Sequence, residues 1–456
     1  MSARQFQGMA PKRDIVVTGA GVVSPIGIGK GPFWTALREG QSGIRRLDAI
    51  GDLILPPPIG GLVADFDPKQ YVRPRKSLKV MSRDIQLAFA AADLACVDAG
   101  LREHPVAPER LGVVFGAALI PGELEEFIGT YRNCMNDGQF DFRRWGPAAV
   151  SEMFPLWMLK YLPNMPACHI GIGQDARGPN NSITMGDVSS LSAVAEAVRI
   201  LERGQADAMI VGGVGERLHP VIWGRSIAGE LSSRGDNPTA ASRPFDAERD
   251  GAVGSEGAAA FLLETRSHAK TRGVPILARV LGYASAFDRT GSFFDKNSAS
   301  GSVKGESPIF ADRKIGTVPG SAAVRRVLST ALQDAGLTPA ELGFVVAHGK
   351  STIDDDRIEA EAIRSVLGDV PVTAPKGHFG YLGAGCGALE MAVSVLAFQH
   401  GLIPPTLNYE HPDPQCPINV VHGRPMPMKR RTALVLSHSP LGQAVAVVLA
   451  GADTYH

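Results

Sequence analysis

A strand-to-helix turn with a carboxylate at its apex is where residue types and spacing most clearly suggest chemistry. The segment NNSITMGDVSSLSAVAEAVRI (180–200) has the pattern of a short apolar strand that turns sharply into a helix. Such turns often display a nucleophile, because the helix N-terminus lowers the pKa of a thiol. Here the apex is Asp187, so the question is what chemistry a carboxylate at this position serves.

Asp187 also has a purely structural explanation. Aspartate is a preferred helix N-cap, since its side chain accepts a hydrogen bond from an amide one turn further on. A carboxylate near a helix N-terminus is stabilised by the dipole, by ~0.3–1 kcal/mol when exposed. Ser189 and Ser190 lie two and three residues beyond the apex. No base is evident for them, so we do not expect either serine to be the nucleophile.

The elements around this turn alternate between strands and helices. Continuous apolar runs, typical of strands buried on both faces, occur at 14–24, 111–119, 206–216, 257–265, 275–285, 342–349 and 432–451. Helical patterns lie between them, at 82–101, 189–204, 321–337 and 386–402. Gly100, Gly204, Gly336 and Gly401 stand where helix C-caps are expected. The alternation predicts a layered α/β architecture.

The chain divides into two plausible halves. We place the first at 1–268 and the second at 269–456. Residues 286–320 are rich in Gly and Ser and lack periodicity, so they are predicted to form a long surface loop.

The bulk composition excludes several classes. The 456 residues are 44% hydrophobic, and 46 Lys+Arg balance 46 Asp+Glu, so nothing points to nucleic acid. The cysteines are five, widely spaced and without a CxxC pair, which predicts neither a disulfide framework nor a zinc site. We expect no metal, no cofactor, no signal peptide, no membrane span and a reduced, cytoplasmic setting.

Several motifs together resemble the β-ketoacyl-acyl-carrier-protein synthases, the condensing enzymes of type II fatty acid and polyketide synthesis. They are VVTGAGVVSPIGIGKGPFWTALREGQSGI (16–44), ELSSRGDNPTAASRPFDAERDGAVGSEGAA (230–259), DAGLTPAEL (334–342), VVAHGKSTIDDDRIEAE (345–361) and APKGHFGYLGAGCGALE (374–390). The resemblance implies a thiolase-like fold, in which duplicated halves build five layers, α/β/α/β/α, and the chain forms a dimer.

The resemblance also implies a set of site residues. The family uses a nucleophilic cysteine, two histidines, a lysine and a glutamate. The cysteine position falls on Asp187, and no cysteine occurs between Cys168 and Cys386. The first histidine matches His348, the lysine Lys376 and the glutamate Glu359. The second histidine position falls on Tyr381; His378 would replace it only with a rearranged backbone.

Two further departures concern substrate binding. Lys350 stands where the family usually has a small residue, and SPLGQ (439–443) matches the glycine loop that gates the acyl pocket. In that loop Leu441 replaces the usual aromatic gate and Gly442 follows it. We hypothesise that an ionised Asp187 pairs with Lys350; the alternative is a solvated surface lysine. Tyr381 is alternatively simple packing, and His348 a relic that hydrogen-bonds locally.

A basic stretch, RPRKSLKVMSRD (73–84), carries Arg75, Lys76, Lys79 and Arg83. The comparable region of the family meets acidic acyl carrier protein, and clustered positive charge steers such a partner. The alternative is a solvated helix start.

The resulting prediction is a family member that no longer condenses. We expect a chain-length-factor-like subunit that binds acyl carrier protein, as a homodimer or as a heterodimer with an active ketosynthase. The alternative is an enzyme on acyl or malonyl thioesters, either a decarboxylase or an atypical β-ketoacyl synthase. An ordinary ketosynthase would need a nucleophile that the sequence lacks.

Overall fold

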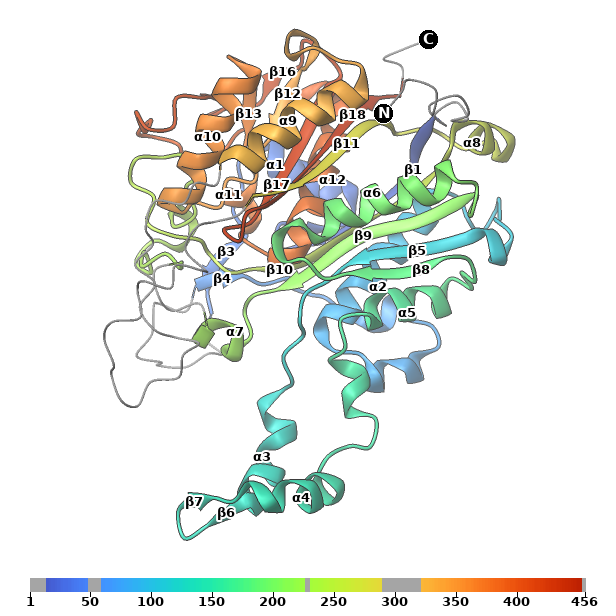
Figure 1. The fold of residues 1–456 in the computed structure, drawn as a ribbon, viewed down its shortest axis with the longest axis vertical. Helices are drawn as coiled ribbons and strands as arrows, with labels where there is room; N and C mark the ends of the chain where they lie inside the picture. Colours follow the sequence, from blue (N-terminus) through green and yellow to red (C-terminus); the bar gives the residue numbers. More distant parts are fainter. Residues whose placement is uncertain (1–13, 48–58, 226–229, 289–320, 453–456) are drawn as a thin grey trace, which may run out of the picture.

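A computed structural model describes residues 14–47, 59–225, 230–288 and 321–452. They form a mixed α/β fold around a twelve-stranded sheet (Figure 1). From residue 289 on, the loop predicted at 286–320 lies outside the described residues. In the part of the chain that is described, no helix is long and apolar enough to cross a membrane.

The large sheet combines the strands of both halves. The first half supplies β1 (Ile15–Ser24), β5 (Leu111–Gly116), β8 (Asn180–Ile183), β9 (Ala208–Glu216) and β10 (Glu256–Thr265), with β2 (Gly27–Ile28) paired to β1. The second half supplies β11 (Ala278–Phe287), β12 (Phe344–Val346), β13 (Pro371–Thr373), β17 (Thr432–His438) and β18 (Gln443–Gly451), with β15 (Asn419–Val420) at the outer edge. The order across the sheet is β15-β13-β12-β17-β18-β11-β1-β10-β9-β5-β8.

The two halves repeat one topology. In the first, β1 pairs antiparallel with β10, β10 antiparallel with β9, β9 parallel with β5, and β5 parallel with β8. In the second, β11, β18, β17, β12 and β13 follow with the same sequence of directions. Antiparallel pairing of β1 with β11 joins the halves. This repeat confirms the predicted duplication, and the predicted division at residue 268 falls in α8 (Arg266–Arg272), which connects the two halves.

The helices complete five layers (Figure 1). The outer layer of the first half is α2 (Arg83–Asp98) with α5 (Met165–Gly173), and that of the second half is α9 (Ser321–Ala335) backed by α10 (Ile353–Leu367). Between the strands of the first half and those of the second lie α6 (Ser189–Glu202) and α12 (Cys386–His400), which contact strands of both halves. From its first residue to Phe398, α12 is buried on all sides, as a central helix must be.

Glycines account for one close contact between a strand and a helix and for the ends of four helices. A Cβ added at Gly21 in β1 would lie 2.1 Å from the carbonyl oxygen of Ala91, so only glycine lets α2 approach the strand this closely. The four predicted helix-terminal glycines have positive φ angles: 61° at Gly100, 67° at Gly204, 68° at Gly336 and 66° at Gly401.

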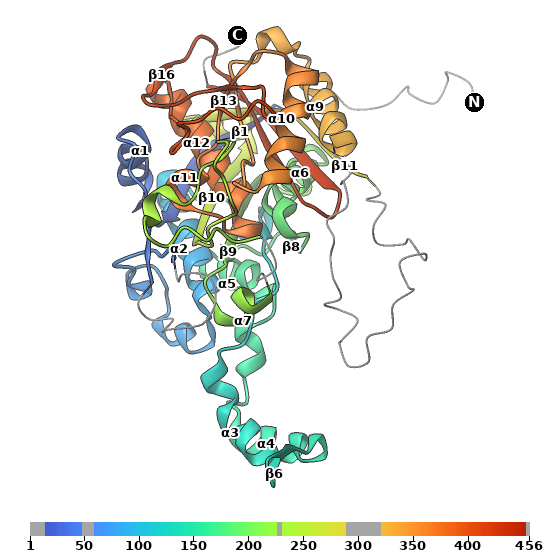
Figure 2. The ribbon, with the colours of Figure 1, turned by 90° about the vertical axis from the view of Figure 1, so that its left-hand side faces the viewer.

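Smaller elements lie around this body. They are α1 (Lys30–Arg38), α7 (Pro220–Arg225), α11 (Lys376–Phe379), and the pairs of β3 (Ile44–Arg46) with β4 (Ile59–Gly61) and β14 (Leu402–Ile403) with β16 (Met426–Pro427). One excursion leaves the body altogether. It contains α3 (Leu124–Cys134), the hairpin β6 (Met135–Asn136) and β7 (Gln139–Phe140), and α4 (Trp145–Glu152), and it projects away in both views (Figures 1 and 2). We call residues 119–158 the arm.

Candidate functional site

The turn predicted at Asp187 is present between β8 and α6. A single 3-10 turn, Gly186–Val188, joins the two, with φ 60° at Gly186. Asp187 is buried, with 5% of its surface exposed. The expectation that Asp187 caps α6 is wrong, because the N-cap residue is Val188 and no side chain accepts a capping hydrogen bond there.

The serines after the apex have structural surroundings. The Ser189 hydroxyl donates to the carbonyl of Gly186 at 2.6 Å and accepts from the amide of Met185 at 2.9 Å, so it holds the turn. Ser190 is fully buried. Neither arrangement is that of an activated nucleophile, which needs an adjacent base.

The carboxylate of Asp187 is bound by Tyr381, the residue predicted at the second histidine position. The Tyr381 hydroxyl donates a hydrogen bond to Asp187 Oδ1, and both side chains are buried. The backbone of Tyr381 is fixed, since its amide donates to Val253 at 2.7 Å and its carbonyl accepts from Ser255 at 2.9 Å. Burial raises the pKa of the Tyr381 hydroxyl, and Asp187 raises it further. The hydroxyl therefore keeps its proton and serves as a donor.

Two cations lie against the Tyr381 ring. Lys350 Nζ is 4.7 Å from the ring centroid, and Arg217 Cζ is 5.3 Å from it. Both distances are within the range of cation–π attraction. The buried Asp187–Tyr381 pair thus has positive charge beside it.

Lys350 has a different ionic partner from the one expected. Its Nζ lies 3.7 Å from Asp355 Oδ2 and 4.7 Å from the centroid of the Tyr381 ring, and among the described residues it forms no ion pair with Asp187, so the hypothesised direct pair is wrong. The alternative of a solvated lysine is wrong as well, since Lys350 is 3% exposed. Burial opposes the charge, but Tyr381, Asp355 and Asp187 outweigh it and raise the pKa of Lys350. Lys350 is therefore a buried cation.

His348 is a buried, neutral imidazole. Its amide donates to Glu359 Oε1 at 2.6 Å, and the next amide donates to Glu359 Oε2 at 2.7 Å, so Glu359 fixes the loop. Burial and the nearby cation of Lys376 hold the pKa of His348 well below its usual value. Lys376 Nζ lies 3.2 Å from Nδ1, which leaves the proton on Nε2. That Nε2 is 3.9 Å from Asp187 Oδ2 and makes no hydrogen bond.

Lys376 is tied to Glu390, the last residue of the motif at 374–390, which the sequence analysis did not assign to the site. The Lys376 ammonium donates to Glu390 Oε1 and to the carbonyl of His348. Burial raises the pKa of Glu390 to about 7, although Lys376 opposes the shift. All three predicted supports, His348, Lys376 and Glu359, are therefore brought together with Asp187 and Tyr381, and Glu390 joins them.

Two other residues of the site were not predicted from the sequence: His438, which lies next to His348, and Asp355, which lies next to Lys350. The ring of His438 is 5.0 Å from that of His348, centroid to centroid, and its Nε2 is 3.7 Å from Glu359 Oε2. Burial opposes a charge on His438, but Glu359, Asp355 and Asp187 outweigh it and raise its pKa. A single histidine at the end of a buried strand carries no motif that would have indicated this position.

His378, the possible substitute for the second histidine, is bound elsewhere. Its Nδ1 faces the carbonyl of Gln41 at 3.0 Å and its Nε2 faces the carbonyl of Pro405 at 2.8 Å. Burial lowers the pKa of His378, although the two carbonyls oppose the shift. With both ring nitrogens occupied, His378 has none left for a ligand at Asp187.

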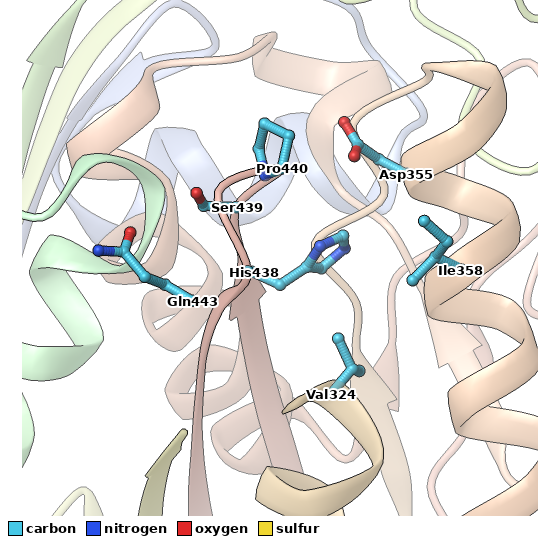
Figure 3. A pocket seen from close by; sticks show the side chains of 8 residues that line it. Val324, Asp355, Ile358, His438, Ser439, Pro440 and Gln443 are labelled. Atoms are coloured by element: carbon cyan, nitrogen blue, oxygen red, sulfur yellow. The ribbon is translucent and has the colours of Figure 1, made fainter. Parts of the chain in front are cut away.

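The loop at 439–442 borders a pocket (Figure 3). Its lining residues are Val324, Asp355, Ile358, His438, Ser439, Pro440, Gly442 and Gln443. Gly442 therefore lies where the resemblance places a substrate contact. Leu441 is not among the lining residues and is 47% exposed.

The four cations of the basic stretch at 73–84 have two different environments: three are exposed and one is paired with a buried carboxylate. Arg75, Lys76 and Lys79 lie in a 3-10 segment, Arg75–Val80, and are exposed. Arg83, in contrast, donates to buried Glu256 at 2.7 and 3.0 Å, so its charge is already neutralised. Arg83 is thus a structural residue, and the exposed positive charge belongs to the other three.

Among the described residues, one cluster has ligand atoms close enough to hold a cation. Asp246, Glu248 and His411 place such atoms within 4.8 Å of one another. Arg243 lies 3.1 Å from Asp246 and 3.5 Å from Glu248, so a guanidinium already balances the carboxylates. We assign no metal to this cluster.

A duplicated α/β fold with a strand-to-helix turn at the contact of its central helices defines the thiolase-like class of proteins. Residues 12–269 match the Beta-ketoacyl synthase N-terminal domain, and residues 302–410 match the C-terminal domain. The chain therefore belongs to the β-ketoacyl synthase family, the ketosynthases of fatty acid and polyketide synthesis.

Relatives and solved structures agree with this family. The 3-oxoacyl-[acyl-carrier-protein] synthase 2 of Synechocystis sp. is 32% identical over 422 residues, which cover 91% of this chain and 92% of the relative. The ishigamide ketosynthase/chain length factor has a TM-score of 0.80 at 27% identity and covers 98% of this chain and 100% of its own. The complex of a type II polyketide synthase acyl-carrier protein with its ketosynthase bound to the hexaketide has the same TM-score and identity, with coverages of 97% and 100%.

Proposed function

We propose that this protein is a ketosynthase-family subunit that does not condense, and that it binds acyl carrier protein and pairs with an active ketosynthase in fatty acid or polyketide synthesis. The observation that carries the proposal is the hydrogen bond from Tyr381 to Asp187. Asp187 is proposed to stand at the position of the nucleophile and Tyr381 at that of the second histidine, and the two side chains are hydrogen-bonded to each other instead of facing a substrate.

The chemistry of a carboxylate supports this reading. An acyl-aspartate would be a mixed anhydride, which reacts with water and is poorly suited to hold a growing chain. An ionised carboxylate donates no hydrogen bond and repels the carboxylate of a malonyl unit. The second histidine is replaced by a tyrosine whose proton is committed to Asp187, and deletion of one donor to a developing oxyanion typically costs ~2.7–4 kcal/mol.

The arm supports assembly with a partner subunit. Most of the large hydrophobic side chains that are exposed in the described chain lie between Leu119 and Met158. Phe142 is 75% exposed and Val150 is 88% exposed, while the Tyr131 and Trp145 rings, 5.2 Å apart, hold the tip together. A concentrated apolar surface on a projecting element marks a protein interface. The structural relatives include a ketosynthase/chain length factor, which makes a ketosynthase-type subunit the partner we propose.

The exposed cations of Arg75, Lys76 and Lys79 are the proposed carrier-protein contact. Among the structural relatives is a ketosynthase in complex with an acyl-carrier protein. Clustered exposed charge accelerates encounter with an oppositely charged partner.

One observation favours the alternative of a thioester decarboxylase. His348 Nε2 carries a proton, has no hydrogen-bond partner and lies beside Asp187, so it retains a donor for a thioester oxygen. This alternative requires a protonated Asp187, because the ionised form repels a malonyl carboxylate.

The test is an assay of the purified protein with acyl and malonyl carrier protein, alone and together with a ketosynthase that has an intact cysteine. We expect no product from the protein alone and a complex with the partner. Condensed product from the protein alone would contradict the proposal, and malonyl decarboxylation without condensation would establish the alternative. The Asp187→Cys variant, tested in the same way, shows whether the substitution alone removed the activity.

A further inference from the structure

The pocket beside the 439–442 loop adjoins the buried site through two polar residues. Asp355 and His438 line it, and Figure 3 shows both side chains at its wall. His438 lies against His348, which is next to Asp187, and Asp355 lies next to Lys350, which is against the ring of Tyr381. The pocket and the Asp187 turn are thus separated by only one layer of side chains.

The first side chain of this layer is His348. Its ring lies 5.0 Å from the ring of His438 on the pocket side, and its Nε2 lies 3.9 Å from Asp187 on the inner side. His348 is fixed in place, because Glu359 holds its backbone and Lys376 lies 3.2 Å from its Nδ1.

The second side chain is Lys350. Its ammonium lies 3.7 Å from Asp355 on the pocket side and 4.7 Å from the Tyr381 ring centroid on the inner side. Unlike the His348 ring, Lys350 has a long, flexible stem, and the contacts described for its tip are one ion pair and one ring face. Lys350 is therefore the member of the layer that can be displaced or shortened without disturbing the backbone.

We propose that Lys350 closes the passage between this pocket and Asp187, and that Asp355 holds it in the closed position. An elongated ligand that enters by the pocket, such as an acyl thioester, is stopped at the ammonium group before it reaches the Asp187 turn. This closure is separate from the loss of the nucleophile. It does not depend on which partner the protein binds.

A thiol placed at the apex reports on the passage. In the Asp187→Cys variant, the rate of alkylation of that cysteine by iodoacetamide measures its accessibility, because only an accessible thiolate reacts. The labelled peptide is identified by mass spectrometry. Cys168, which is half-buried in α5, serves as an internal reference for the reagent.

Shortening Lys350 should open the passage. We expect alkylation at position 187 to be at least about tenfold faster when Lys350→Ala is added to the reporter variant. Lys270→Ala in the same background is the control, since Lys270 is an exposed lysine and its loss should leave the rate unchanged. Equal rates with and without Lys350→Ala would overturn the proposal, as would a reporter that is already fully reactive with Lys350 intact.

A second variant covers the case in which Lys350→Ala does not fold. Asp355→Asn keeps the lysine and removes only the charge that holds it, so alkylation should rise by a smaller factor. An unchanged rate in Asp355→Asn would then count against the role of Asp355 as the anchor of a closed gate. Loss of the Lys350 cation would by itself raise the thiol pKa and slow alkylation, so a faster rate reports a gain in access. The alkylation experiments involve no condensation, so their outcome is independent of the condensation assay.

Discussion

The hydrogen bond between Tyr381 and Asp187 predicts a measurable coupling energy. Replacing Tyr381 by Phe removes the hydroxyl but keeps the ring that Lys350 and Arg217 contact. Asp187 is 5% exposed and Tyr381 is 6% exposed, so water replaces the lost donor poorly. Since hydrogen bonds to charged groups contribute about 1.5–3 kcal/mol, Tyr381→Phe should lower the free energy of unfolding by that amount.

A double-mutant cycle isolates the contribution of the Tyr381–Asp187 hydrogen bond to the free energy of unfolding. With Asp187→Ala already present the hydroxyl has no carboxylate to bind, so adding Tyr381→Phe should change stability by less than about 1 kcal/mol. The coupling energy, which is the difference between these two costs, should therefore be about 0.5–3 kcal/mol. The assay is urea denaturation followed by tryptophan fluorescence, with the four proteins compared under one condition.

A second tyrosine–carboxylate pair provides the control. The Tyr161 hydroxyl donates to Glu126 at 2.8 Å, and the Glu126 side chain is 27% exposed. The same cycle at Tyr161 and Glu126 should give a smaller coupling, since water reaches the carboxylate. A coupling below about 0.5 kcal/mol at Tyr381 and Asp187 would refute the account of the site as a closed, bonded pair.

Three other predictions concern pH, the carrier protein and the arm. His348→Gln should reduce the loss of stability at acid pH. The pKa of His348 in the folded protein lies well below the ordinary 6.5, so the stability present above pH 6.5 is lost as the pH falls below it, by at most about 1.4 kcal/mol per pH unit. Denaturation at several pH values measures this loss. Lys76→Glu with Lys79→Glu should weaken binding of acyl carrier protein about tenfold at low salt, measured by fluorescence anisotropy. Phe142→Ser with Val150→Ser should abolish co-purification with an active ketosynthase and change the unfolding free energy by less than about 0.5 kcal/mol.

Each of these variants has a matched control. His104→Gln changes an exposed imidazole and should keep the pH dependence of the parent protein; equal slopes in His104→Gln and His348→Gln would contradict the pH argument. Lys429→Glu changes an exposed lysine outside the basic stretch and should not affect carrier binding. Ile353→Ser changes an apolar residue that is 57% exposed outside the arm, so loss of the complex in that variant would show that the arm is not the specific contact.

The fold was largely predictable because its signals are local. Buried strands appear as continuous apolar runs, and the glycines at 100, 204, 336 and 401 mark helix ends. The duplication was implied only by the family resemblance, and in the structure it consists of a shared order and direction of strands. Topology is set by which surfaces pack together, and many sequences satisfy the same packing.

The site positions were predictable, but their contacts were not. The register predicted that Asp187 and Tyr381 share one site, and the structure brings their side chains into contact. It shows neither of the two roles considered for Asp187, the helix cap and the ion pair with Lys350, among the described residues. Between Lys350 and Asp355 the chain passes through Ser351 at φ 68°, a conformation that residue type alone does not indicate. This turn precedes α10, whose first turn presents Asp355 to the lysine.

The absence of a covalent acyl intermediate is the central claim, and intact-mass spectrometry tests it most directly. The native protein is incubated with acyl carrier protein bearing a thioester, and its mass is then measured without reduction. We predict an unchanged mass for the native protein. A stable increase equal to the acyl group, located by peptide analysis at any side chain around Asp187, would contradict the claim that this site no longer holds an acyl chain.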